Sequence, residues 1–125
     1  MTDMHLDENE QELLKACVKL IGSTGATAFT IRYEDTETPT VWIAVAKYGK
    51  DDEDVNTTYQ TGSDVIPIEA VLRLCERLID GGICIHCNKT SGFDLAFESV
   101  FDTSNELCWY SYDPETKEFR RSCET

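Results

Sequence analysis

The hydrophobic positions change their period along the chain, and the changes mark the predicted elements. Residues 10–21 carry apolar side chains at helical spacing, namely Leu13, Ala16, Cys17, Leu20 and Ile21. Residues 67–80 show the clearest amphipathic stripe. It begins at Pro67, which suits a first helical turn, and stops before Gly81 and Gly82. The pattern therefore predicts two amphipathic helices.

Between these helices the period shortens to two, which is typical of strands. Residues 26–34 alternate between small or polar and large side chains, and residues 40–48 are rich in β-branched and aromatic types. Turn-forming residues join the two segments, so we predict a β-hairpin with one face on the core. Residues 49–64 lack any such period and hold an acidic run, which predicts an exposed acidic connection.

The C-terminal third predicts a second hairpin. Residues 107–112 and 118–122 flank a segment, 113–117, whose composition favours a turn. Residues 93–101 alternate in part and predict a short strand. The expected fold class is α+β, with two amphipathic helices on a small antiparallel sheet and a zinc knuckle plus β-hairpin at the C-terminal end.

The expected organisation is one domain over residues 1–125, because no repeat or low-complexity linker interrupts the chain. Residues 1–9 are predicted to be a flexible acidic tail, and residues 83–123 the zinc-binding portion. The chain has no secretory leader pattern and no long apolar run, so we expect a cytoplasmic location and no membrane partner.

The charge balance limits the classes of partner. The chain has 24 acidic and 11 basic residues and a formal net charge of −13. Such a chain repels the phosphates of nucleic acids and anionic lipids, so direct binding to either is not expected. The charge either serves solubility alone or forms a negative surface that meets a basic partner or imitates nucleic acid.

Four of the six cysteines have the arrangement of a structural zinc site. Cys84 and Cys87 form a Cys-x-x-Cys knuckle that supplies two ligands. A hairpin turn centred near Glu115 would place Cys108 opposite Ser122, with Cys123 one step beyond. The predicted ligands of Zn²⁺ are therefore Cys84, Cys87, Cys108 and Cys123.

Other roles for these cysteines stay open. Four thiolates also suit an iron–sulfur cluster, and Cys84 with Cys87 has the form of a thiol redox site, although no helix start follows it. A Cys108–Cys123 disulfide is disfavoured in a reducing cytoplasm. His86 is expected to face solvent or to lie beside the ligands without binding the metal. Cys17 and Cys75 lie on apolar helix faces and are expected to pack in the core.

The sequence favours a binding protein over an enzyme. It has no phosphate-binding loop, and four thiolates would leave a zinc ion no open position for water. The candidate partner-binding residues are two aromatic side chains that share a strand face and the acidic run, namely Trp42, Tyr48, Asp51, Asp52, Glu53 and Asp54. Core packing is the alternative role for Trp42, and for Trp109.

The chain also resembles a known family. The residues that carry the resemblance are 69–82 running into Cys84-x-His86-Cys87, Cys108-Trp109-Tyr110-x-Tyr112-Asp113-Pro114, and Phe119-Arg120-Arg121-x-Cys123. They are similar to a family of small cysteine-containing proteins of actinobacteria and their phages. The resemblance implies four shared cysteines and a bacterial or host cytoplasmic setting, and it lends no activity.

The expected function is that of a small zinc-stabilised accessory protein that binds a host or self protein, including modulation of a host pathway by a phage. The alternative is a zinc-stabilised module in nucleic-acid transactions that docks through Arg120 and Arg121. A small thiol redox enzyme is the third possibility.

Overall fold

The computed structural model describes residues 6–34, 41–49, 57–94 and 107–123. Within these ranges the chain forms two helices and six strands. Their order and bounds are α1 (Glu8–Ser23), β1 (Ala28–Glu34), β2 (Val41–Tyr48), β3 (Thr58–Asp64), α2 (Pro67–Ile79), β4 (Ser91–Asp94), β5 (Cys108–Asp113) and β6 (Glu118–Arg121).

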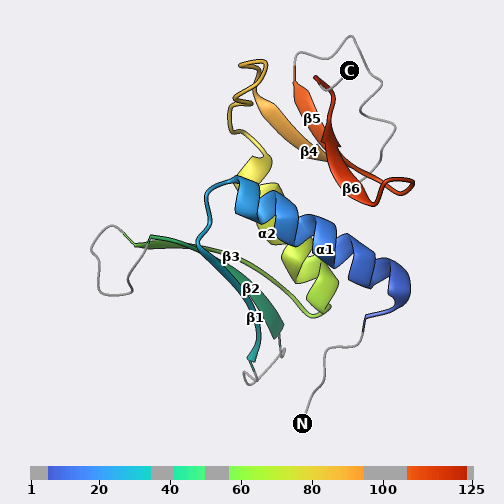
Figure 1. The fold of residues 1–125 in the computed structure, drawn as a ribbon. Helices are drawn as coiled ribbons and strands as arrows, with labels where there is room; N and C mark the ends of the chain where they lie inside the picture. The colour runs from blue at the N-terminus through green and yellow to red at the C-terminus, as the bar shows by residue number, and fades with distance from the viewer. Residues whose placement is uncertain (1–5, 35–40, 50–56, 95–106, 124–125) are drawn as a thin grey trace.

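The helices lie between two three-stranded sheets (Figure 1). The first sheet has the order β1-β2-β3 and is antiparallel. The second sheet has the order β4-β5-β6, with β4 parallel and β6 antiparallel to β5. The α+β class is confirmed, with two helices on a small antiparallel sheet and a C-terminal hairpin, β5–β6, to which β4 adds in parallel to complete the second sheet.

Helix α1 begins earlier than its apolar stripe indicates. The Asp7 side chain accepts a hydrogen bond from the Glu10 N–H at 2.7 Å, and the Glu10 carboxylate accepts one from the Asp7 N–H at 3.2 Å. This reciprocal capping box satisfies two backbone donors and fixes the helix start at Glu8. The predicted flexible tail over residues 1–9 is therefore wrong at its last residues, and residues 1–5 lie outside the described part.

The core lies where both helices meet the first sheet. Its buried residues come mainly from α1, α2 and the centre of β2 and are Cys17, Leu20, Ile21, Ala44, Ala46, Ile68, Ala70, Val71, Leu72, Leu74, Cys75 and Ile79. The two helix cysteines are fully buried, which confirms their predicted role in the core. The adjacent Cys75 thiol, together with burial, raises the pKa of Cys17 well above its ordinary value.

Strand β3 corrects the prediction of an exposed connection over residues 49–64. Thr58–Asp64 pairs with β2 along its length, with Gly62 opposite Ala44. Helix α2 crosses so closely that a Cβ at Gly62 would lie 2.4 Å from the Leu74 nitrogen and 2.5 Å from the Ala70 oxygen. This largely polar segment thus forms a strand because it pairs with β2 and because its Gly62 lets α2 approach closely. Residues 50–56 lie outside the described part.

Candidate metal centre

The first two cysteines sit in a tight turn between α2 and β4. The Cys84 N–H donates to the Lys89 carbonyl at 2.9 Å, and the Asn88 N–H donates to the Cys84 carbonyl at 2.8 Å. Asn88 closes the turn with a φ of 62°, a conformation that asparagine tolerates better than most residues. These backbone bonds define what we call the knuckle, residues 83–90, and they fix Cys84 and Cys87 on one short loop.

The other two cysteines lie at the open end of the β5–β6 hairpin. Tyr112 pairs with Phe119 and Tyr110 with Arg121, so the predicted register is wrong by one residue. The turn spans residues 114–117, with Lys117 at a φ of 58°, and is therefore centred half a residue later than expected. Extending the observed register places Cys108 opposite Cys123. Directly opposed residues share a face of the sheet, so both thiols point the same way.

The four cysteines converge, as predicted, into a group that is positioned to hold a metal ion. Their sulfur atoms all lie within 4.8 Å of one another. The Cys84 and Cys123 sulfurs are 3.7 Å apart, and two sulfurs bound tetrahedrally to zinc at about 2.3 Å would be separated by about 3.8 Å. A disulfide bond is far shorter, at about 2.05 Å, and all four thiols are free. The arrangement therefore fits a single tetrahedral ion.

Burial and hydrogen bonding act in opposite directions on the two buried thiols, Cys84 and Cys108. Burial opposes ionisation of Cys84, but hydrogen bonds from the backbone N–H groups of His86 and Cys87 and from the Tyr110 hydroxyl lower its pKa to about 6. Burial raises the pKa of Cys108 to about 12, and the neighbouring thiols of Cys123 and Cys84 add to that rise. Thiols packed this closely oppose one another's ionisation, and a divalent cation relieves that opposition by neutralising the negative charge.

Other residues singled out in the sequence lie outside the cluster. His86 is exposed, in agreement with its predicted position. Trp42 and Tyr48 are half-buried on the core-facing side of β2. The Trp42 ring packs edge-on against Tyr33 at 5.0 Å, and the Tyr48 hydroxyl bonds to Thr24 at 2.7 Å. Their packing is thus explained, and a role in partner binding stays a prediction.

Two further predictions concern Trp109 and the acidic run. Trp109 is half-buried, and its ring covers Gly92 so closely that a Cβ there would lie 2.7 Å from it. The ring is therefore part of the packing of the second sheet. Asp51, Asp52, Glu53 and Asp54 lie outside the described residues.

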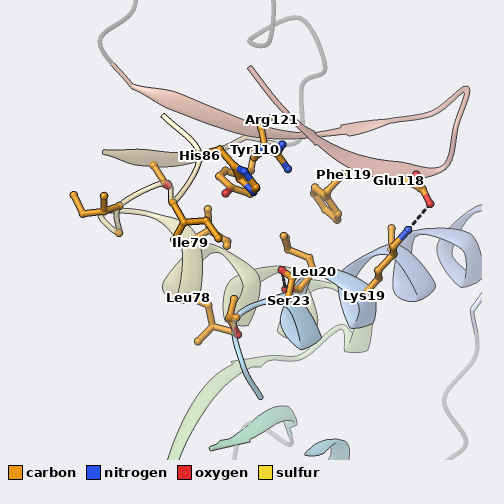
Figure 2. A pocket seen from close by; sticks show the side chains of 16 residues that line it. Lys19, Leu20, Ser23, Leu78, Ile79, His86, Tyr110, Glu118, Phe119 and Arg121 are labelled. Carbon is orange, nitrogen blue, oxygen red and sulfur yellow. Dashed lines mark hydrogen bonds and ion pairs between the residues drawn. The ribbon is translucent and has the colours of Figure 1, made fainter. Parts of the chain in front are cut away.

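A cleft beside the knuckle was not predicted from the sequence. It encloses about 580 Å³ between α1, the end of α2, the knuckle and the second sheet (Figure 2). Its lining includes Ile83 and Ile85, which are 63% and 85% exposed. The two isoleucines that flank Cys84 are the sequence signal for this surface, but only the fold shows that they are exposed and border a cavity.

The fold and the cysteine cluster define the class of this molecule, a small α+β protein with a four-cysteine centre able to hold a metal ion. The chain matches no protein-family profile, no curated protein and no solved structure. Among the described residues, neither helix is long and apolar enough to cross a membrane.

Proposed function

We propose that this protein is a small acidic accessory protein, stabilised by structural zinc, that binds a protein partner of its host or a second copy of itself. The observation that carries the structural role of the metal is the closed set of four converging thiols, two of them buried. Four protein ligands complete a tetrahedron and leave no position for water or substrate. Such a site stabilises a fold and does not activate a reactant.

Zinc is the metal that this ligand set favours. Thiolates are soft ligands that select zinc, copper(I) or iron–sulfur clusters. In a cluster the cysteines surround a cage of several iron and sulfide ions, whereas these four sulfurs converge within 4.8 Å of one another. That spacing supports one ion.

The surface charge supports binding to a basic protein. A net charge of −13 attracts basic surfaces and disfavours nucleic acid. The acidic run at Asp51, Asp52, Glu53 and Asp54 concentrates four of these charges in consecutive residues. With a phage or actinobacterial origin, the partner would be a bacterial protein whose basic surface this chain occupies, including a DNA-binding protein that it blocks by imitating nucleic acid.

The two alternative functions have less support. Arg120 pairs with the buried Asp113 at 3.3 Å, and Arg121 lines the cleft, so the two arginines do not form one exposed basic patch. A thiol redox site opens a helix at its cysteines, but here the knuckle returns through a turn to β4. Both observations favour the binding protein.

The test combines metal analysis with affinity capture. We expect one zinc per chain by elemental mass spectrometry, and one dominant, nuclease-resistant partner captured from an actinobacterial lysate. A variant with Asp51→Asn, Asp52→Asn, Glu53→Gln and Asp54→Asn should lose that partner and keep its zinc.

The matched control neutralises four exposed carboxylates elsewhere, at Glu69, Glu76, Asp80 and Glu115. It should keep the partner. Equal loss in both variants would mean that total charge, and not the acidic run, holds the partner. Capture of background proteins alone by the wild-type chain would refute the binding role.

A further inference from the structure

Strand β3 forms an open edge of the first sheet. Among the described strands it has a single neighbour, β2. The Thr61 carbonyl accepts a hydrogen bond from Arg77 Nη1 at 3.2 Å, so it points to the open side of the strand and not to β2. In an antiparallel strand the N–H and C=O of one residue point to the same side, and this side alternates along the chain. Tyr59, Thr61 and Ser63 therefore present their backbone donors and acceptors at the open edge.

The side chains of β3 do not protect this edge against pairing with another strand. Edge strands of natural proteins are commonly protected by lysine, proline or other charged side chains. The only charged residue of β3 is Asp64 at its end, and that carboxylate is paired with Arg73 at 2.8 Å. The other edge strand, β1, carries Arg32 and Glu34. The edge of β3 is thus the better suited of the two to accept a further strand.

A face of α2 beside this edge carries charges of both signs. Arg73, Glu76, Arg77 and the C-cap Asp80 are exposed, and their spacing of three or four residues places them on one side of the helix. With part of β3 they line a hollow of about 550 Å³. The signs are opposite at positions equally far from the midpoint between Glu76 and Arg77. When the same face of a second copy approaches in the antiparallel direction, every charge therefore meets its opposite.

The strand and the helix share the position of this midpoint. Arg77 contacts Thr61 and Arg73 contacts Asp64, so α2 runs antiparallel to β3. The point between Glu76 and Arg77 therefore lies beside Thr61, near the centre of the strand. A single two-fold axis at Thr61 would pair both the two strand edges and the two charged faces. Such a self-complementary surface is what a symmetric dimer requires.

From this coincidence we infer that two copies of the chain associate through β3 and α2 into a symmetric dimer. The two β3 strands pair antiparallel about Thr61, so that Tyr59 lies opposite Ser63 of the second copy and the two three-stranded sheets become one. Backbone groups of these three residues supply about six hydrogen bonds. The central pair joins two threonines, a favourable combination across strands.

The charged faces of the two α2 helices add specificity to this strand pairing. Arg73 meets Asp80 of the second copy, and Arg77 meets Glu76 of the second copy. Each arginine uses one nitrogen within its own chain, Nε in Arg73 and Nη1 in Arg77, and a guanidinium has five N–H donors. The Thr61 carbonyl has two lone pairs, so it accepts from Arg77 and from the second strand together. The bonds within each chain are therefore kept in the dimer.

The inference rests on the proposed function, because it names a second copy of the chain as a partner and gives that partner a surface apart from the acidic run. The test is sedimentation velocity on the full zinc-loaded chain over a range of concentrations. We expect the mass to rise to that of two chains. A mass of one chain at every concentration up to about 1 mM, where only very weak association would escape detection, would refute the inference.

Charge reversal tests the pairing of the two helices. Glu76→Arg and Arg77→Glu should each weaken dimerisation at least about tenfold, although they shift the net charge of the chain in opposite directions. The double variant Glu76→Arg with Arg77→Glu restores opposite charges across the axis, so it should dimerise nearly as well as the wild type. Lys15→Glu reverses an exposed charge on α1 and should have no effect. A double variant that stays as weak as the single variants would refute the symmetric pairing.

Thr61→Pro tests the strand edge. Proline is tolerated in an edge strand where its nitrogen faces solvent, so this variant should keep its zinc and its thermal midpoint as a monomer but lose the dimer. Zinc content and thermal midpoint are measured for every variant, so a lost fold is distinguished from a lost interface. A dimer that persists in both Thr61→Pro and Arg77→Glu would lie on another surface and would refute the inference.

The two variants designed for the proposed function separate the two ideas. The acidic-run variant should keep the dimer and lose the captured partner. The control variant, which neutralises Glu76 and Asp80, should lose the dimer and keep the captured partner. A wild-type chain that dimerises but captures only background would refute binding of a host protein alone, whereas a monomer that captures one partner would refute the dimer alone.

Discussion

The two sheets of this protein are stabilised by different means. The first sheet packs on α2 through a continuous apolar core that includes Ala44, Ala46, Val71 and Leu74. The second sheet and the knuckle contribute no buried aliphatic side chain among their described residues, and their buried side chains are those of Cys84, Ser91, Cys108, Ser111 and Asp113. A continuous aliphatic core therefore stabilises the first region, whereas the second has four cysteines that are positioned to hold a metal ion.

Aromatic side chains connect the second sheet to the rest of the molecule. Phe93, Tyr110 and Phe119 are partly buried against the core, and the rings of Phe93 and Phe119 pack at 5.5 Å. This contact orients the sheet but does not enclose it, since every one of these rings stays partly exposed. The comparison therefore predicts that the two regions respond differently to the same kind of perturbation.

The largest expected effect is the loss of the metal centre. Cys108→Ser removes a buried thiol that we propose binds zinc, so we expect zinc to be lost and the free energy of unfolding to fall by about 3 kcal/mol or more. Hydrogen exchange should rise in β5, β6 and the knuckle and much less in β1–β3. A chelator applied to the wild-type chain should reproduce the pattern.

Cys75→Ala is the control for that experiment, because this cysteine is equally buried but lies in the apolar core. It should keep its zinc and lose about 1 kcal/mol of stability through the small cavity it leaves. A Cys108→Ser protein with full zinc content and unchanged exchange in the second sheet would contradict the division into two regions.

The next effect acts on the apolar region alone. Gly62→Ala places a Cβ against the backbone of α2, where neither partner can move cheaply. We expect a loss of about 2 kcal/mol with unchanged zinc content. Gly22→Ala is the matched control, since a Cβ there meets no atom within 4 Å, and it should be neutral or stabilising by about 0.5 kcal/mol. Equal thermal midpoints for the two variants would refute the close helix–strand contact.

The close contact between α2 and Gly62 of β3 also shows what the sequence could not predict. Both helices follow from their apolar stripes, and β1 and β2 from their alternation and β-branched residues. Strand β3 was missed because Thr58–Asp64 has almost no apolar side chains, and its pairing depends on α2 crossing over Gly62. The parallel pairing of β4 with β5 was missed because it joins segments on either side of residues 95–106.

The metal centre was more predictable than the cleft. Local turn geometry places the two cysteines of the knuckle and the two at the ends of the hairpin, and the one-residue error in register left the set unchanged. The two pairs meet through the parallel β4–β5 pairing, which the sequence did not predict. The cleft instead depends on how α1 and β6 approach each other, 99 residues apart at the Lys19–Glu118 pair. No local pattern carries that information.

A smaller effect is expected from the cap of α1, the helix that contacts both regions through α2 and β6. Asp7→Ala breaks the capping box and should cost about 1 kcal/mol in chemical denaturation. Asp7→Ser keeps a side-chain acceptor at the cap and should lose only a small part of that free energy of unfolding. If both substitutions had the same effect, the cap would not be what fixes the helix start.

The smallest effect is a pH dependence that differs between the regions. The Glu115 N–H, at 2.9 Å, holds the pKa of the buried Asp113 carboxyl below its ordinary value, with Arg120 at 3.3 Å contributing. Because the folded pKa lies below the unfolded value of about 3.9, the stabilisation is complete above about pH 5 and is lost as the pH falls through the folded pKa. Asp113→Asn cannot titrate, so its thermal midpoint should lie below that of the wild type at pH 7 and approach it near pH 2.

Asp64 provides the comparison in the apolar region. The Arg73 guanidinium, at 2.8 Å, and the Ile66 N–H lower its pKa in the same direction. The Arg73 side chain is 63% exposed, however, and solvent and salt screen an exposed pair. Asp64→Asn should therefore show a smaller difference from the wild type at pH 7, and added salt should reduce that difference further. A larger change in thermal midpoint for Asp64→Asn than for Asp113→Asn would contradict this expectation. It would mean that buried polar contacts such as that of Asp113 contribute less to the stability of the second sheet than its lack of an aliphatic core implies.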